Sequence, residues 1–111
     1  MKIDIGQLEF IDKTARAIVT DLETETGLEF TVTSLYRIGD GGVHGALPVR
    51  GVDLRMRNFI IGRSIVALVN SRWRYDPQRI NMVCAVLHGE DSHMHIHIQS
   101  HPNTLRLNTP Y

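Results

Sequence analysis

Three histidines at alternate positions are the residues of this chain best placed to do chemistry. The stretch "DSHMHIHIQS" sets His93, His95 and His97 between apolar residues. On a strand, residues two apart point to the same face at about 6.5 to 7 Å, so His95 and His97 can address one small site. His93 and His97 would lie about 13 Å apart on such a strand, too far to share an ion. Imidazole is a common metal ligand, so the pattern favours a metal site that uses at most two of the three.

A polar strand face is the simpler interpretation, because polar residues commonly alternate along an antiparallel sheet. Gln99 continues the histidine face, and a run of this kind favours the metal site instead. A catalytic zinc ion usually has three protein ligands and one open position. The glycine-rich segment "YRIGDGGVHGALPVRG" holds His44 and runs into a strand that bears Asp53. Together with the histidine strand, these two residues complete a His, Asp, His set.

Three motifs in this order resemble a known family. "SLYR", "HGALPVRGVD" and "HIHIQ" are similar to the successive motifs of the zinc D-alanyl-D-alanine carboxypeptidase and Hedgehog-domain family, which includes short phage-encoded cell-wall peptidases. The resemblance covers roughly residues 30–100. It implies that His44, Asp53 and His97 bind Zn²⁺, and that His95 stabilises the transition state.

The resemblance also implies a substrate and a base. Arg37 matches an arginine that binds a substrate carboxylate in family members, and Ser34 matches the serine of the same motif. Asp91 and Glu90 are both candidates for the catalytic base, and the sequence does not choose between them. The implied activity is zinc-dependent hydrolysis of peptidoglycan stem or cross-link peptides, as a carboxypeptidase or an endopeptidase.

Two alternatives stay open. The eight residues "GALPVRGV" between His44 and Asp53 are more than is usual in the family, and Gly42 replaces a common serine. These departures would suit a non-catalytic phage structural or wall-binding module that keeps the fold. "HMH" and "HIH" also fit a DNA-nicking domain with paired histidines, whose nucleophile could only be Tyr111, the sole tyrosine downstream.

Hydrophobic periodicity predicts the elements that position these residues. Apolar residues that recur every three or four positions predict a helix over residues 6–24, and Gly27 is expected to end it. Asn58 is placed to cap a second helix, over 59–73, with a buried stripe of Ile61, Ile65, Leu68 and Val69. Strands are predicted over 28–35, 52–56, 80–87 and 93–99, and the tail is left irregular. The order favours an α+β fold, a small antiparallel sheet with helices packed on one face, as the resemblance also implies.

Composition limits the remaining expectations. A length of 111 residues predicts one domain, 1–111, and we expect a monomer. Twelve basic and twelve acidic residues cancel, which argues against a nucleic-acid partner. No apolar leader or spanning segment is evident, so we expect cytoplasmic synthesis, no membrane insertion, and release to the wall or carriage in a virion. Cys84 is expected to be a buried apolar residue, Trp73 to fill the edge of the core, and His88 and His101 to lie outside the site.

Overall fold

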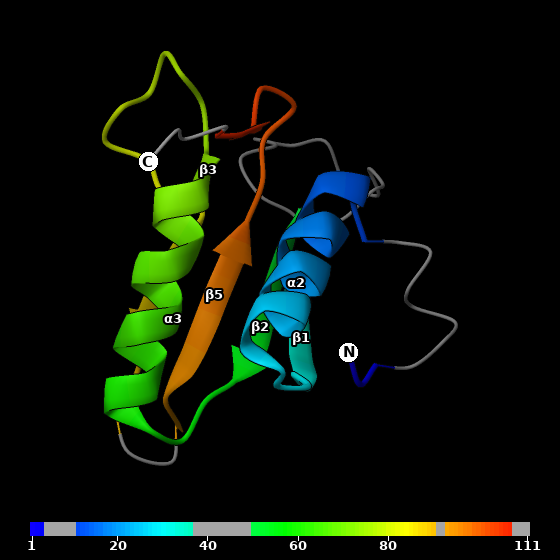
Figure 1. Ribbon diagram of the computed structural model, residues 1–111, viewed down its shortest axis with the longest axis vertical. Coiled ribbons are helices and arrows are strands. Elements are labelled where there is room, and N and C mark those ends of the chain that lie inside the picture. The colour runs from blue at the N-terminus through cyan, green and yellow to red at the C-terminus, as the bar shows by residue number, and fades with distance from the viewer. Residues whose placement is uncertain (4–10, 37–49, 91–92, 108–111) are drawn as a thin grey trace.

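The computed structural model describes residues 1–3, 11–36, 50–90 and 93–107. Two helices and a four-stranded antiparallel sheet make up most of this part, and a short two-stranded ribbon lies beside them (Figure 1). In chain order the elements are α2 (Lys13–Thr26), β1 (Val32–Tyr36), β2 (Gly51–Arg55), α3 (Phe59–Arg72), β3 (Trp73–Arg74), β4 (Ala85–His88), β5 (His95–Gln99) and β6 (Leu105–Arg106). The predicted α+β class is confirmed.

Helix α2 begins later than its periodicity predicts. The Asp12 carboxylate accepts hydrogen bonds from the backbone N–H groups of Thr14 and Ala15, which makes Asp12 the N-cap. A continuous helix from residue 6 is therefore wrong. The predicted end is right, because Gly27 takes the left-handed conformation, at φ 73°, and its N–H bonds to the Glu23 carbonyl. The buried face of the helix carries Ala15, Ile18, Val19 and Leu22.

Helix α3 has the predicted cap, and part of the predicted stripe. The Asn58 side chain accepts a hydrogen bond from the Ile61 N–H at 3.0 Å. Ile65 and Val69 are buried, but Ile61 is exposed. Gly62 takes the buried position instead, where a Cβ atom would lie 3.0 Å from the Leu87 side chain. Close approach of the helix to β4 therefore depends on this glycine.

The main sheet has the strand order β1-β2-β5-β4, and every neighbouring pair is antiparallel. β1 carries a register irregularity between Val32 and Ser34. The predicted strand over 28–35 starts too early, because Leu28 is exposed and regular pairing begins at Val32. The predicted strands over 80–87 and 93–99 are similarly shortened to β4 and β5.

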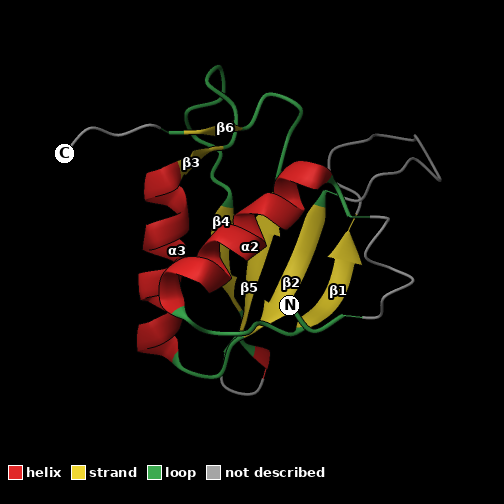
Figure 2. Cartoon of the chain, turned by 45° about the vertical axis from the view of Figure 1, so that its right-hand side comes forward, coloured by secondary structure: helices red, strands yellow, loops and turns green. Residues whose placement is uncertain are grey.

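Helix α2 crosses one face of the sheet, with α3 beside it (Figure 2). Val52, Leu54, Ile96 and Ile98 point to this covered face and are almost completely buried. Directly paired residues of antiparallel strands share a face, and successive residues alternate. The intervening residues, Asp53, His95 and His97, must therefore lie on the opposite face, which we call the open face.

The ribbon of β3 and β6 was not predicted, because two-residue strands leave no periodic signal. It extends from the end of α3, and Arg106 of β6 donates to Asp21 of α2 at 2.8 Å. Trp73 is buried at this edge of the core, as predicted, and so is Cys84. In the described part of the chain, neither helix has the length and apolar character that crossing a membrane requires.

Candidate functional site

The open face brings together residues that lie far apart in the sequence. Asp53 of β2 is directly opposite His97 of β5, and His95 is opposite Arg55 at the next outward-facing position. The apolar residues between them fix this orientation, since a slip of one residue would expose Ile96 and Ile98 and bury both imidazoles. The core therefore positions the polar residues of the open face.

Asp53 and His97 form a close polar pair. His97 Nδ1 lies 2.9 Å from Asp53 Oδ1, a hydrogen-bond distance. Asp53 is only 4% exposed, and His97 is partly buried. A carboxylate buried to this degree requires partners that offset the loss of its hydration. Because a carboxylate oxygen accepts, His97 Nδ1 is the donor in this hydrogen bond.

His95 is held from both sides of its ring. Its Nδ1 lies 3.0 Å from the His93 carbonyl oxygen, and its Nε2 lies 3.5 Å from Asp53 Oδ2. Because a carbonyl oxygen can only accept, Nδ1 of His95 must be the donor in the first contact. Nε2 is then left facing the carboxylate of Asp53. This arrangement gives His93 a role through its backbone, although its side chain is exposed and precedes the strand.

His88 lies beside these residues, so the expectation that it lies outside the site is wrong. It pairs with His95 across β4 and β5, so both side chains share the open face. Its ring centroid lies 5.7 Å from that of His95 and 6.0 Å from that of His97. Folding "VLHGEDSHMHIH" back on itself as a hairpin could have suggested this neighbour, but the register of the hairpin was not fixed by the sequence. His101 lies elsewhere, against Tyr75 and Asp76.

The other predicted site residues are divided between described and undescribed parts of the chain. Ser34 of β1 pairs with Asp53 and is half-buried beside it. Glu90 is exposed in the connection between β4 and β5, and its carboxylate forms no ion pair with another described residue. Arg37, His44, Asp91 and Tyr111 lie outside the described residues.

The donor types on the open face suit zinc. Bonds of about 2.0 to 2.1 Å in a tetrahedral site separate the ligand atoms by roughly 3.3 Å. The two Asp53–histidine contacts, at 2.9 and 3.5 Å, lie on either side of that value. Within the ranges described, however, no group of three or more His, Cys, Asp or Glu side chains is arranged to hold a metal ion. Any such site must therefore draw on a further residue, and His44 is the one that the motif implies.

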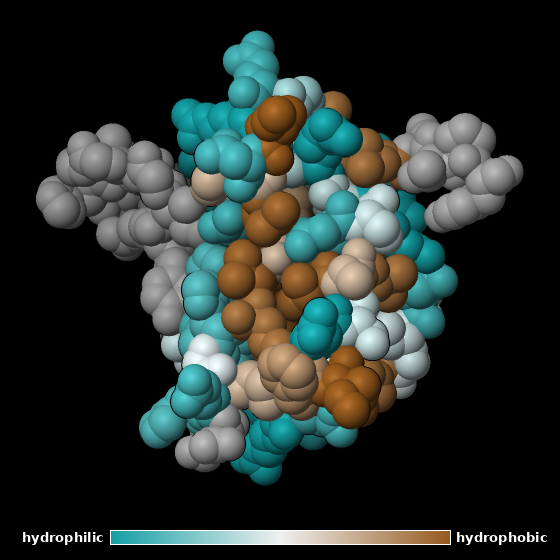
Figure 3. All heavy atoms as spheres, turned by 90° about the vertical axis from the view of Figure 1, so that its left-hand side faces the viewer, coloured by the Kyte–Doolittle hydropathy of each residue, from teal (hydrophilic) through white to brown (hydrophobic). Residues whose placement is uncertain are grey.

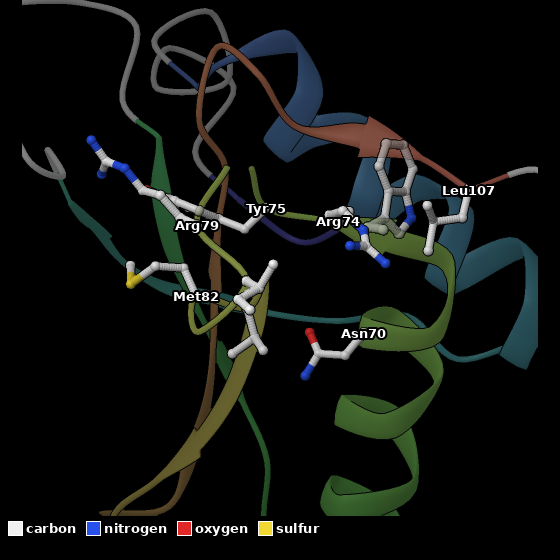
Figure 4. Close-up of a pocket in the computed structure, with 9 residues that line it drawn as sticks. Asn70, Arg74, Tyr75, Arg79, Met82 and Leu107 are labelled. Carbon is white, nitrogen blue, oxygen red and sulfur yellow. The ribbon is translucent and has the colours of Figure 1, made fainter. Parts of the chain in front are cut away.

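A separate cavity of about 150 Å³ lies at the other end of α3, between that helix and the 75–83 connection. Asn70, Arg74 and Met82 are among the residues around it (Figure 4). The side-chain amide of Asn70 is already hydrogen-bonded within the fold, because it both donates to and accepts from the backbone of Ala85 at 2.9 Å. None of the open-face histidines lines this cavity, so it is not part of the candidate site.

Comparison with known proteins adds no assignment. No family model, no curated protein and no solved structure matches the chain. The sequence motifs and the geometry of the open face are therefore the observations that bear on function.

Proposed function

We propose that the chain is a zinc-dependent peptidase that hydrolyses peptide bonds of peptidoglycan. The observation that carries the proposal is the contact of Asp53 with His97 at 2.9 Å, with His95 beside it, on the open face of the sheet. The class of substrate comes from the resemblance of "SLYR", "HGALPVRGVD" and "HIHIQ" to the cell-wall peptidase motifs.

Asp53 and His97 would hold the zinc ion together with His44. When bound, the ion supplies a Lewis acid and brings the pKa of a water ligand towards 7. Asp53 is suited to this role because a buried carboxylate and a partly buried imidazole are already fixed against each other. Little reorganisation of side chains is then needed on binding.

His95 would stabilise negative charge on the substrate. Its Nδ1 is committed to the His93 carbonyl, so Nε2 is the atom available for the reaction. In its protonated form, Nε2 can donate to the oxyanion that develops on the scissile carbonyl oxygen, and a lost contact of this kind costs about a hundredfold or more in rate.

The remaining roles follow the motif. Glu90 or Asp91 would take a proton from the attacking water and pass it to the leaving amine. Arg37 would bind a carboxylate of the stem peptide through two N–H groups. Ser34 pairs with Asp53 in the sheet, so it would lie on the same side of the bound peptide as Asp53.

Turnover of purified peptidoglycan tests this proposal. We expect release of new amino or carboxyl termini from the zinc-loaded protein, loss of that release with a chelator, and its loss in His97→Ala. An Asp21→Ala variant, altered in an ion pair on α2 far from the open face, is the matched control and should retain turnover. Binding of one zinc ion per chain without any hydrolysis would instead favour the non-catalytic wall-binding module. The long segment between His44 and Asp53 is the feature of the sequence that suggests this alternative.

A further inference from the structure

The first turn of α3 exposes three consecutive bulky apolar side chains. Phe59 is 57% exposed, Ile60 75% and Ile61 43%. Successive helical residues point about 100° apart, so three in a row cannot all reach one core. Apolar side chains gather over the side of the molecule that α3 forms (Figure 3). Scattered apolar residues are ordinary on a surface, whereas a cluster of this kind marks an interaction site.

Two arginines flank this turn. Arg57 comes shortly before it in the sequence, and Arg63 lies on α3 with its guanidinium carbon 5.7 Å from the centre of the Phe59 ring. Both side chains are exposed, and neither forms an ion pair with another described residue. We call Arg57, Phe59, Ile60, Ile61 and Arg63 the α3 patch. It combines apolar surface with positive charge that no described acidic residue neutralises.

The acidic residues of the described chain are mostly committed elsewhere. On α2, Asp21 contacts Arg72 and Arg106, and Glu25 contacts Arg72. Glu23 pairs with the N-terminal amine, and Glu29 with Lys2. The chain has a net charge of zero, but among its described residues the α3 patch is left basic.

We propose that the α3 patch docks the protein on an anionic lipid surface. Phosphate headgroups would accept from the guanidinium groups of Arg57 and Arg63, while Phe59 and Ile60 enter the boundary between headgroups and acyl chains. The charge complementarity and the exposed apolar side chains together fit this partner. A soluble polyanion would satisfy the arginines and leave the apolar residues in water. A second copy of the chain would have to supply acidic groups, and most of those in the described residues are already paired within the fold.

Lipid docking by the α3 patch does not depend on the proposed peptidase activity, because the patch lies on the helical side of the sheet and the candidate site lies on the open face.

Flotation with lipid vesicles tests the docking. We expect the full chain to float with mixed phosphatidylcholine and phosphatidylglycerol vesicles, not with phosphatidylcholine alone, and to be released by salt. Replacing both Phe59 and Ile60 by Ser should weaken binding at least tenfold. Arg57→Glu and Arg63→Glu should each weaken it about fivefold or more.

Two variants outside the α3 patch serve as matched controls. Ile80→Ser removes an apolar residue that is 84% exposed, and Arg74→Glu reverses an exposed arginine. Both should bind as the parent does. The proposal would be overturned by no flotation with the mixed vesicles, by equal weakening in the control variants, or by concentration-dependent dimerisation that the Phe59 and Ile60 replacements abolish. Binding lost to the arginine variants but unaffected by the double Ser variant would also reject it, in favour of simple ion exchange.

Discussion

The two faces of strand β5 are made by alternate residues of one short segment, yet they follow different physical rules. Ile96 and Ile98 are 0% exposed against the helices, whereas His95 and His97 share the open face with Asp53. The covered face needs only apolar side chains of suitable size at alternate positions of the strand. The zinc site proposed for the open face needs particular atoms at particular distances. The comparison predicts that stability and the proposed zinc binding can be varied separately in this strand.

Ile96→Ala should have the largest effect on stability. Removing a fully buried Ile side chain leaves a cavity and typically lowers the free energy of unfolding by about 2 to 5 kcal/mol. Urea unfolding followed by circular dichroism measures this loss. The folded fraction should still bind zinc as tightly as the parent, and a parallel loss of zinc affinity would break the separation between the two faces.

Gly89→Ala should disturb the open face from a distance. Gly89 has φ 82°, and a Cβ atom added there would collide with the His93 carbonyl group. That carbonyl accepts from His95, so the substitution should displace His95 as well as strain the loop, at a cost of about 1 to 3 kcal/mol. The chemical shifts of the His95 ring should change.

Gly27→Ala is the matched control for that substitution. Gly27 is also left-handed, at φ 73°, but a Cβ atom there would have nothing within 4 Å. It should lower stability through backbone strain alone and leave the shifts of His95 unaltered. Equal changes of the His95 shifts in both variants would mean that the His93 carbonyl does not orient the ring.

Cys84, which is buried in the core, should make stability depend on alkaline pH. Burial raises the pKa of its thiol from 9.0 to about 12. The unfolded thiol therefore ionises first as pH rises above 9, so the folded state loses stability between about pH 9 and 12 and is unaffected below. At pH 10 the loss attributable to Cys84 is roughly 1 kcal/mol. The decline in urea midpoint from pH 8 to 10 should be smaller in Cys84→Ala, and an identical decline would show that the thiol is not protected.

His88→Ala should have the smallest effect. Its ring packs near those of His95 and His97, and ring contacts of this kind contribute about 0.5 to 1.5 kcal/mol. Zinc affinity measured by competition with a chelating dye should fall about two- to tenfold. His101→Ala, which removes a histidine from the other end of the molecule, should leave that affinity unchanged.

Local signals predicted the framework better than the assembly of the site. The cap at Asn58 and the stop at Gly27 could be predicted because each depends on one residue and its immediate neighbours. The position of Asp53 and His97 on one face followed from the alternation of their strands. The position of His88 could not be predicted in this way, because it depends on the register of the hairpin formed by β4 and β5. The exposure of Ile61 could not be predicted either, because it depends on the rotation of α3 that turns Gly62 towards β4.

Zinc stoichiometry tests the central claim most directly. Metal analysis of the zinc-loaded and desalted parent should give one ion per chain, while Asp53→Ala and His97→Ala, each shown to be folded by circular dichroism, should retain little or none. Because His44 is the third ligand that the motif implies, His44→Ala should behave in the same way. A parent that retains no zinc, or variants that retain as much as the parent, would contradict the metal site on the open face.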